Sequence, residues 1–334
     1  MKLSKATLAA LAFFAVSLVP TAAHAQLFRT YLASDGSDAN PCTLAAPCRL
    51  LPAALAAVAS YGEIWMLDSA NYNTAQVDVT KSVTILAIPG AVGSVVATGG
   101  GSALNVNGSV SVTLRNLVIV RLNSGSTGVS FVQGYELNVY DCEISGVTDG
   151  IIASAPNGKV NVRNTVFHDM NTSGLRASGS VIVALDRVQI NGTNTAVSGY
   201  GGSRISISNS ALVGNNVGVD AFANGGTVRI SVEGSNLSGN NYGITAGSYQ
   251  AGDVAEVIAT RNQISHSYYA GVYANESSGS TVTVVMDGNS LTHNANGVQF
   301  LGSGLATVYS RGNNTARFNG NDVMGGSLTA LSGI

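Results

Sequence analysis

Residues 205–219 read ISISNSALVGNNVGV, and residues 230–244 repeat this pattern as ISVEGSNLSGNNYGI. Each stretch alternates aliphatic with polar residues, passes through a turn and ends in a Gly-aliphatic pair. Such pairs recur at spacings of 22, 24, 22, 22, 25, 28 and 26 residues, with Ala196-Val197 filling one gap. The pairs are Gly128-Val129, Gly150-Ile151, Gly174-Leu175, Gly218-Val219, Gly243-Ile244, Gly271-Val272 and Gly297-Val298. Self-similarity at this period predicts a solenoid of stacked units.

The repeats align on one turn position, which is Asn116, Asp141, Asn164, Arg187, Asn209, Gly234, Arg261, Gly288 and Gly312. Aliphatic residues stand four and two positions before it, as Ile205 and Ile207 do before Asn209. This alternation is typical of strands, and the remaining residues are poor helix formers, which disfavours a leucine-rich repeat. We therefore predict an all-β parallel solenoid of about ten coils.

A second turn column is rich in asparagine. It holds Asn123, Asn171, Asn194, Asn216, Asn241 and Asn319, with Thr148, Tyr268 and Ala295 in the other coils. Stacked amides can hydrogen-bond along the solenoid, and Asn tolerates the left-handed turn conformation. The column therefore predicts an asparagine ladder.

The first 25 residues are typical of a secretory signal peptide, because two lysines precede an apolar run and Ala23-His24-Ala25 follows it. We expect cleavage after Ala25, a secreted or periplasmic protein, and no membrane span after processing. Charges are spread along the chain, which disfavours nucleic acid. The predicted single domain covers 26–334, with an N-terminal cap and first coil at 26–80, repeats at 81–326 and a tail at 327–334. A short amphipathic helix at 50–60 should cover the first coil.

The cysteines support export. Cys42 and Cys48 lie six positions apart in a turn-rich loop and predict a disulfide. A metal site would need further Cys or His ligands nearby. Cys142 has no His in its own coil, so we expect a buried thiol rather than a nucleophile. The sequence predicts no metal site and no cofactor.

Residues 49–55 (RLLPAAL), residues 62–67 (GEIWML), Tyr72 and residues 81–85 (KSVTI) carry a resemblance to a known group. They resemble the entry into the pectate-lyase-like (pectin lyase-like) right-handed parallel β-helix proteins, and the resemblance covers about 28 to 326. It implies a right-handed parallel β-helix. That superfamily includes polysaccharide lyases, galacturonidases, epimerases, phage tailspikes and adhesins. The motifs Asn-Thr-Asp, Asp-Asp, Gly-His-Gly and Arg-Ile-Lys of polygalacturonases and Asp-Pro-His of alginate epimerases are absent.

Several charged residues have an opposite charge one coil away. The predicted pairs are Arg163 with Asp186, Asp287 with Arg311, Glu136 with Lys159, and Arg229 with Glu256. Glu233 and Asp287 share a column but are two coils apart, with Thr260 between them. Glycosidases need two close carboxyl groups, and no outward column places two in adjacent coils.

The longest coils, from Tyr242 to Phe300, hold an unusual set of side chains. Their tyrosines are Tyr242, Tyr249, Tyr268, Tyr269 and Tyr273. In one turn column, glycine gives way to His266, His293 and Arg317. Tyrosine offers a flat apolar ring with a polar edge, and long loops can wall a groove. The candidate substrate-binding residues are therefore His266, Tyr268, Tyr269, His293 and Arg317.

We expect an exported envelope or extracellular protein that binds polysaccharide or cell-envelope glycan, with no catalytic residue identified. One alternative is a polysaccharide lyase or glycoside hydrolase with a non-standard site, which paired carboxylates or bound Ca²⁺ in one groove would favour. Another is a structural or adhesive rod, which the lack of any groove would favour. We also expect self-association through the C-terminal coil, where no helix or charged strand follows the repeats.

Overall fold

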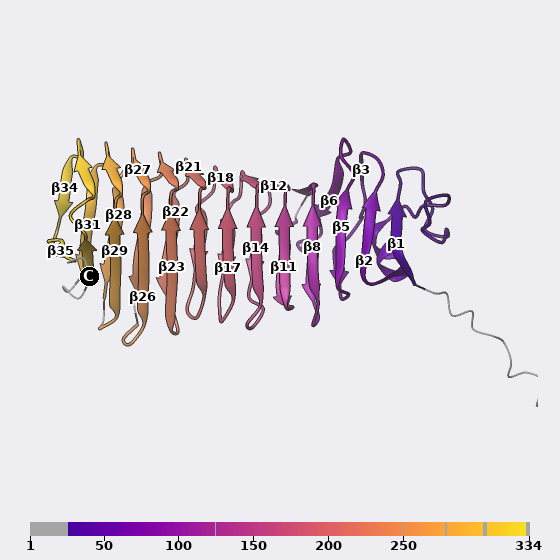
Figure 1. The fold of residues 1–334 in the computed structure, drawn as a ribbon, viewed down its shortest axis with the longest axis horizontal. Coiled ribbons are helices and arrows are strands. Elements are labelled where there is room, and N and C mark those ends of the chain that lie inside the picture. The colour runs from indigo at the N-terminus through magenta and orange to yellow at the C-terminus, as the bar shows by residue number, and fades with distance from the viewer. Residues whose placement is uncertain (1–25, 124, 249, 278, 303–305, 332–334) are drawn as a thin grey trace, which may run out of the picture.

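The computed structural model describes residues 26–123, 125–248, 250–277, 279–302 and 306–331. The predicted signal peptide, Tyr249 and the last three residues of the predicted tail lie outside them. The described chain forms a rod of stacked coils, with the N-terminal coil at one end and β34 (Asn321–Met324) near the other (Figure 1). Among the described residues, no helix has the length and apolar character needed to cross a membrane.

Three parallel sheets run the length of the rod and contain 13, 11 and 11 strands. Sheet 1 contains β1 (Leu27–Leu32), β2 (Val58–Met66), β5 (Val83–Ala87), β8 (Ser111–Arg115), β11 (Glu136–Tyr140), β14 (Lys159–Arg163), β17 (Ile182–Asp186), β20 (Arg204–Ser208), β23 (Thr227–Glu233), β26 (Val254–Thr260), β29 (Thr281–Asp287), β32 (Ala306–Ser310) and β35 (Thr329–Ala330). Sheet 2 contains β3 (Ala70–Asn71), β6 (Gly93–Ala97), β9 (Leu117–Arg121), β12 (Glu143–Ser145), β15 (Val166–His168), β18 (Gln189–Asn191), β21 (Ala211–Val213), β24 (Asn236–Ser238), β27 (Gln263–Ser265), β30 (Ser290–Thr292) and β33 (Thr315–Arg317). Sheet 3 contains β4 (Val77–Val79), β7 (Ser102–Asn107), β10 (Thr127–Gln133), β13 (Asp149–Ala153), β16 (Ser173–Ala177), β19 (Thr195–Gly199), β22 (Val217–Ala223), β25 (Tyr242–Ser248), β28 (Ala270–Glu276), β31 (Asn296–Gly302) and β34.

The predicted solenoid of about ten coils is confirmed, because successive coils contribute strands to the same sheets in turn. Aligned residues pair in register, so that Val183 lies against Ile205 and Leu185 against Ile207. These aliphatic columns point inward and are almost completely buried. Each inward column contributes one aliphatic residue from every coil. Stacking of the coils joins these residues into a continuous core that a single coil lacks.

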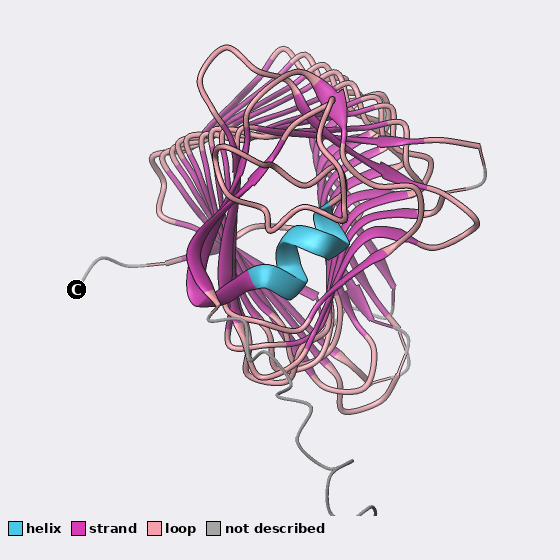
Figure 2. Ribbon diagram, turned by 90° about the vertical axis from the view of Figure 1, so that its right-hand side faces the viewer, coloured by secondary structure: helices cyan, strands magenta, loops and turns pink. Residues whose placement is uncertain are grey.

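The predicted cap is also present. Helix α2 (Leu51–Ala57) is shorter than expected and lies across the N-terminal end of the coils (Figure 2). Its residues Leu51, Ala54 and Leu55 are buried. The Lys81 ammonium donates to the carbonyl oxygens of Leu55 and Val58, each at 2.8 Å. These bonds satisfy carbonyl groups at the end of the helix, where intrahelical donors run out.

The alignment position is the corner between sheets 1 and 2. All nine residues on which the repeats align have a positive φ, from 48° at Asn164 to 79° at Gly312. A left-handed residue turns the chain sharply, and Asn, Asp and Gly adopt that conformation most readily. The conformational preference at this corner explains why the column is visible in the sequence.

A second left-handed column forms the corner between sheets 2 and 3 and precedes a buried ladder. In this ladder the Asn240 Oδ1 accepts from the Asn215 backbone N–H at 2.8 Å, and the Asn319 Oδ1 accepts from that of Asn294 at 3.0 Å. The predicted column lies one residue further on and is more exposed, with Asn216 donating to the Asn194 Oδ1 at 2.9 Å. Asn319 was thus placed in the wrong column.

The cysteines lie as predicted. Cys42 and Cys48 form a disulfide with 4.6 Å between their Cα atoms. Cys142 is buried directly after the corner between sheets 1 and 2, where its Sγ lies 3.5 Å from the Leu117 backbone nitrogen and 3.2 Å from the Tyr140 carbonyl oxygen. Burial raises the pKa of this thiol to about 12. The thiol is therefore protonated at neutral pH and is not a nucleophile there.

Candidate functional site

Four tyrosine rings form one continuous surface beside the corner between sheets 2 and 3. Tyr242 begins β25, Tyr269 precedes β28, and their rings stack with centroids 5.1 Å apart. Tyr273, in β28, lies 5.1 Å from Tyr242, and Tyr268 meets Tyr269 edge to face at 4.7 Å. Tyr268 is 69% exposed and Tyr269 is 46% exposed. The structure thus brings the candidates Tyr268 and Tyr269 together with Tyr242 and Tyr273, which the sequence analysis noted but did not include among the candidate residues.

The candidate histidines also stack. His266 and His293 occupy equivalent left-handed positions in neighbouring coils, and their rings are nearly parallel with centroids 5.2 Å apart. Arg317 does not continue this column, because it pairs with Thr292, and Phe318 stacks on His293 at 5.6 Å. The alignment fails here because the last corner, Gly312-Asn313, holds one residue more than the preceding corners. The same extra residue misplaced Asn319.

A groove of about 350 Å³ opens on the outer face of sheet 3, across β22, β25 and β28. Tyr242 and Tyr273 line it together with Phe222 and Asp220. Gly247 lies between Phe222 and Asn275 in the register of the sheet, and its missing side chain leaves the depression open. The groove and the tyrosine surface are continuous, because Tyr242 belongs to both.

Asp220 is the carboxyl group of this groove, and the sequence analysis did not single it out. It lies in register with Thr245 of the next coil, and the Thr245 hydroxyl donates to its Oδ1. Removal from water raises the pKa of Asp220 above its ordinary value, and the Thr245 hydrogen bond opposes this shift. A signal was available in the sequence, because Asp220 and Tyr273 stand in one outward column two coils apart.

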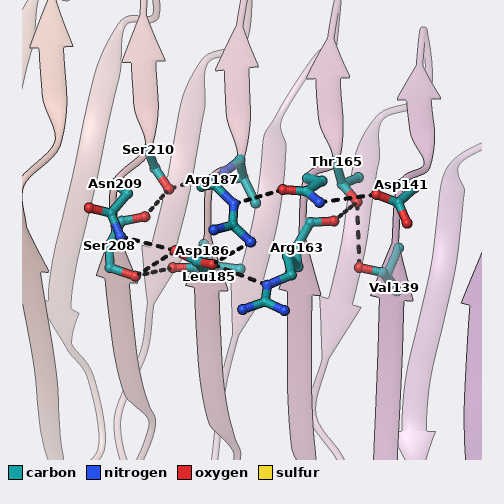
Figure 3. A network of polar contacts seen from close by, with 12 residues as sticks. Val139, Asp141, Arg163, Thr165, Leu185, Asp186, Arg187, Ser208, Asn209 and Ser210 are labelled. Carbon is teal, nitrogen blue, oxygen red and sulfur yellow. Dashed lines mark hydrogen bonds and ion pairs between the residues drawn. The ribbon is translucent and has the colours of Figure 1, made fainter.

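Several ion pairs join neighbouring coils, and Figure 3 shows the one between Arg163 and Asp186. Ion pairs join Arg163 to Asp186 at 3.2 Å, Arg229 to Glu256 at 2.5 Å, Arg311 to Asp287 at 3.6 Å, and Arg261 to Glu233. Three of the four predicted pairs are confirmed. Glu136 and Lys159 lie in register, but Glu136 accepts a hydrogen bond from Asn161 at 2.9 Å. Within the described ranges, no three His, Cys, Asp or Glu side chains are placed to hold a metal ion.

Residues 149–323, more than half of the chain, match the family model described as the right handed beta helix region. The chain belongs to this family. The predicted handedness and fold class are thereby confirmed. No curated protein matches the sequence of this β-helix protein.

Several solved structures are similar to this chain. XylC in its complex with xylose is 8% identical, with 82% of this chain and 70% of XylC covered at a TM-score of 0.64. Pectate lyase Pel9A is 15% identical, with 88% and 80% covered and a TM-score of 0.45. The catalytic domain of a GH87 alpha-1,3-glucanase in complex with nigerose is 11% identical, with 80% and 63% covered and a TM-score of 0.47. At these identities the likeness concerns the fold alone.

Proposed function

We propose that this β-helix protein binds polysaccharide in the groove on sheet 3 and across the adjoining tyrosine surface. The observation that carries the proposal is the run of rings from Tyr273 through Tyr242 and Tyr269 to Tyr268. Sugar rings present apolar faces that pack on aromatic rings, while the hydroxyl groups of Tyr and Thr hydrogen-bond their edges. His266 and His293 flank the same corner and complete the proposed contact surface.

The groove favours binding over catalysis. Among the described residues that line it, Asp220 is the only carboxyl group. Glycoside hydrolysis ordinarily uses two, one as acid and one as base or nucleophile. Asp220 therefore serves the proposed function as a hydrogen-bonding group for a sugar hydroxyl.

We also propose that the protein works outside the cytoplasm. The Cys42–Cys48 disulfide is typical of an oxidising compartment. Export itself rests on the signal peptide expected in residues 1–25, and direct N-terminal sequencing of the exported chain would test the cleavage after Ala25. Detection of the full-length protein in the cytoplasm alone would contradict it.

The binding proposal is tested by titrating neutral and acidic oligosaccharides into the wild type and a Tyr242→Ala/Tyr273→Ala variant. Each stacked ring is worth on the order of 1 kcal/mol, so Kd should rise about tenfold or more for the double variant. Tyr135→Ala removes a 64% exposed tyrosine away from the groove and serves as the control. Equal affinity of the two variants, or no binding of any glycan, would refute the proposal.

A further inference from the structure

The groove on sheet 3 combines one carboxyl group with three aromatic rings. Asp220 and Phe222 lie two residues apart in β22, and side chains two residues apart in a strand point to the same face of the sheet. Tyr242 from β25 and Tyr273 from β28 line the groove with them. All four side chains are half-buried. The carboxyl group is therefore partly withdrawn from water in a setting rich in aromatic rings.

The register of the sheet leaves room for a small group between the carboxyl group and a ring. Asp220, Thr245 and Tyr273 form one outward column over three neighbouring coils. Coils lie about 4.8 Å apart, so a group seated over the short Thr245 side chain lies about one coil from Asp220 and about one coil from Tyr273. In the next outward column, Gly247 follows Phe222 and adds no side chain. The depression therefore continues sideways from Thr245 to Gly247.

The strands that form the groove carry acidic residues and no basic ones. Together with the loops that follow them, β22, β25 and β28 cover residues 217–226, 242–253 and 270–280. These segments contain Asp220, Asp253 and Glu276 but no lysine, arginine or histidine. Backbone N–H groups donate to the carboxylates of Asp253 and Glu276. A concave surface that carries one sign of charge attracts ligands of the opposite sign, so this face favours a cation.

The nearest basic residue in the column of Asp220 belongs to another ion pair. Arg176 lies two coils before Asp220, with Ser198 between them. Its guanidinium group is 3.8 Å from the carboxylate of Asp149, which lies in the coil on the opposite side of β16. Burial is the largest cause of the raised pKa of Asp220. A cationic ligand beside this carboxyl group would favour its ionised form and offset the effect of burial.

We propose that the groove recognises the ammonium group of an amino sugar, with Asp220 pairing with the charge and Tyr242 and Tyr273 packing around it. This inference rests on the proposed function and names its substrate class, a polysaccharide with free amino groups. An ammonium group within about 6 Å of an aromatic ring centroid gains a cation–π attraction, and its hydrogen bond to a carboxylate is stronger than one between neutral groups. Where the sugar carries an amine in place of a hydroxyl, the hydrogen bond proposed for Asp220 becomes an ion pair.

The test compares three oligosaccharides of equal length that share one backbone. Cello-oligosaccharide, chito-oligosaccharide and glucosamine oligosaccharide carry a hydroxyl, an acetamido and an amino group, respectively, at the same carbon of each sugar. Titrations are made at pH 6, where aliphatic amines are protonated. We expect the wild type to bind the glucosamine oligosaccharide about tenfold more tightly than the two uncharged ones. Added salt should reduce this preference, because it screens the ion pair.

Asp220→Asn is the deciding variant, because it keeps the shape of the side chain and removes its charge. It should abolish the preference for the glucosamine oligosaccharide and change the Kd for cello-oligosaccharide less than about twofold. Asp78→Asn is the matched control. Asp78 is an exposed carboxylate in the same outward column of sheet 3, toward the N-terminal end. Its loss should leave the preference intact.

Three results would overturn the inference. The preference could persist in Asp220→Asn, or fall equally in Asp78→Asn, which would reduce it to net charge. The wild type could also bind the glucosamine oligosaccharide no better than the other two. Equal binding of all three that depends on Tyr242 and Tyr273 would leave the proposed polysaccharide binding in place, whereas that proposal fails when no glycan binds at all. The two failures therefore give different results.

Discussion

At the scale of the residue, the Asp220 side chain lines the groove on sheet 3 and lowers the stability of the folded chain when it is ionised. Its pKa is raised because burial disfavours the charged form, and no cation adjoins it in register, since its neighbours there are Ser198 and Thr245. A carboxyl group in this position destabilises the folded chain when ionised. We interpret that cost as the consequence of placing a polar group among aromatic rings for a ligand.

The raised pKa predicts a pH-dependent effect of Asp220→Asn. Below the unfolded-state pKa of about 3.9, the carboxyl group is protonated in both states and contributes no penalty. As the pH rises through the folded-state pKa, the penalty of the half-buried carboxylate becomes complete. The variant should therefore be more stable than the wild type at pH 7, and the difference should vanish near pH 3.

Urea unfolding at the two pH values measures this difference. The Asp35→Asn variant, at an exposed loop position, should match the wild type at both. A difference for Asp220→Asn that is unchanged between pH 7 and pH 3 would show that ionisation of Asp220 does not cause it.

At the scale of the element, hydrogen bonds at the corners contribute to the stability of the rod. A side-chain amide there both accepts and donates, since Asn240 accepts from the Asn215 backbone N–H and donates to the Leu212 carbonyl oxygen, each at 2.8 Å. Asn240 is 1% exposed and Asn215 is 4% exposed. Backbone groups at a corner lack regular ladder partners, and a buried group without a partner is costly. The asparagines therefore continue the sheet hydrogen bonding around the turn.

We predict that Asn240→Leu lowers the free energy of unfolding by about 1–3 kcal/mol, because it leaves the Asn215 N–H and the Leu212 carbonyl unpaired. Asn216→Leu is the matched control one column outward, where the side chain is exposed, and it should cost less than about 0.5 kcal/mol. Denaturant unfolding of both variants provides the comparison. Similar losses from the two variants would rule out a special role for the buried ladder.

The repeat period and the corner positions could be predicted because each imposes a residue type on every coil. The first corner needs a left-handed residue, and the inward columns need aliphatic ones. The asparagine columns were harder to separate, since Asn215 and Asn216 are adjacent in sequence and both stack. One extra residue at Gly312-Asn313 then displaced the last coil, which moved Arg317 out of the histidine column. The groove was missed because its walls come from three coils, and Asp220 is an ordinary outward residue in its own strand.

At the scale of the whole molecule, the two ends of the rod differ in how they are covered. Helix α2 covers the core at the N-terminal end (Figure 2). At the other end β34 and β35 are edge strands among the described residues, and β35 is exposed. Leu301 is 54% exposed and Met324 is 46% exposed close to that edge. Unpaired strand edges with apolar side chains favour addition of another strand.

We therefore predict that the protein self-associates reversibly through this edge, with a second copy as the partner. The weight-average sedimentation coefficient of the wild type should rise with concentration. Leu301→Lys/Met324→Lys should reduce that rise, because charged side chains on an edge strand oppose pairing. Val92→Lys places one lysine at a 52% exposed apolar position near the other end and should leave the association unchanged. A wild type that stays monomeric at high concentration, or equal effects of the two kinds of variant, would show that the edge is protected in solution.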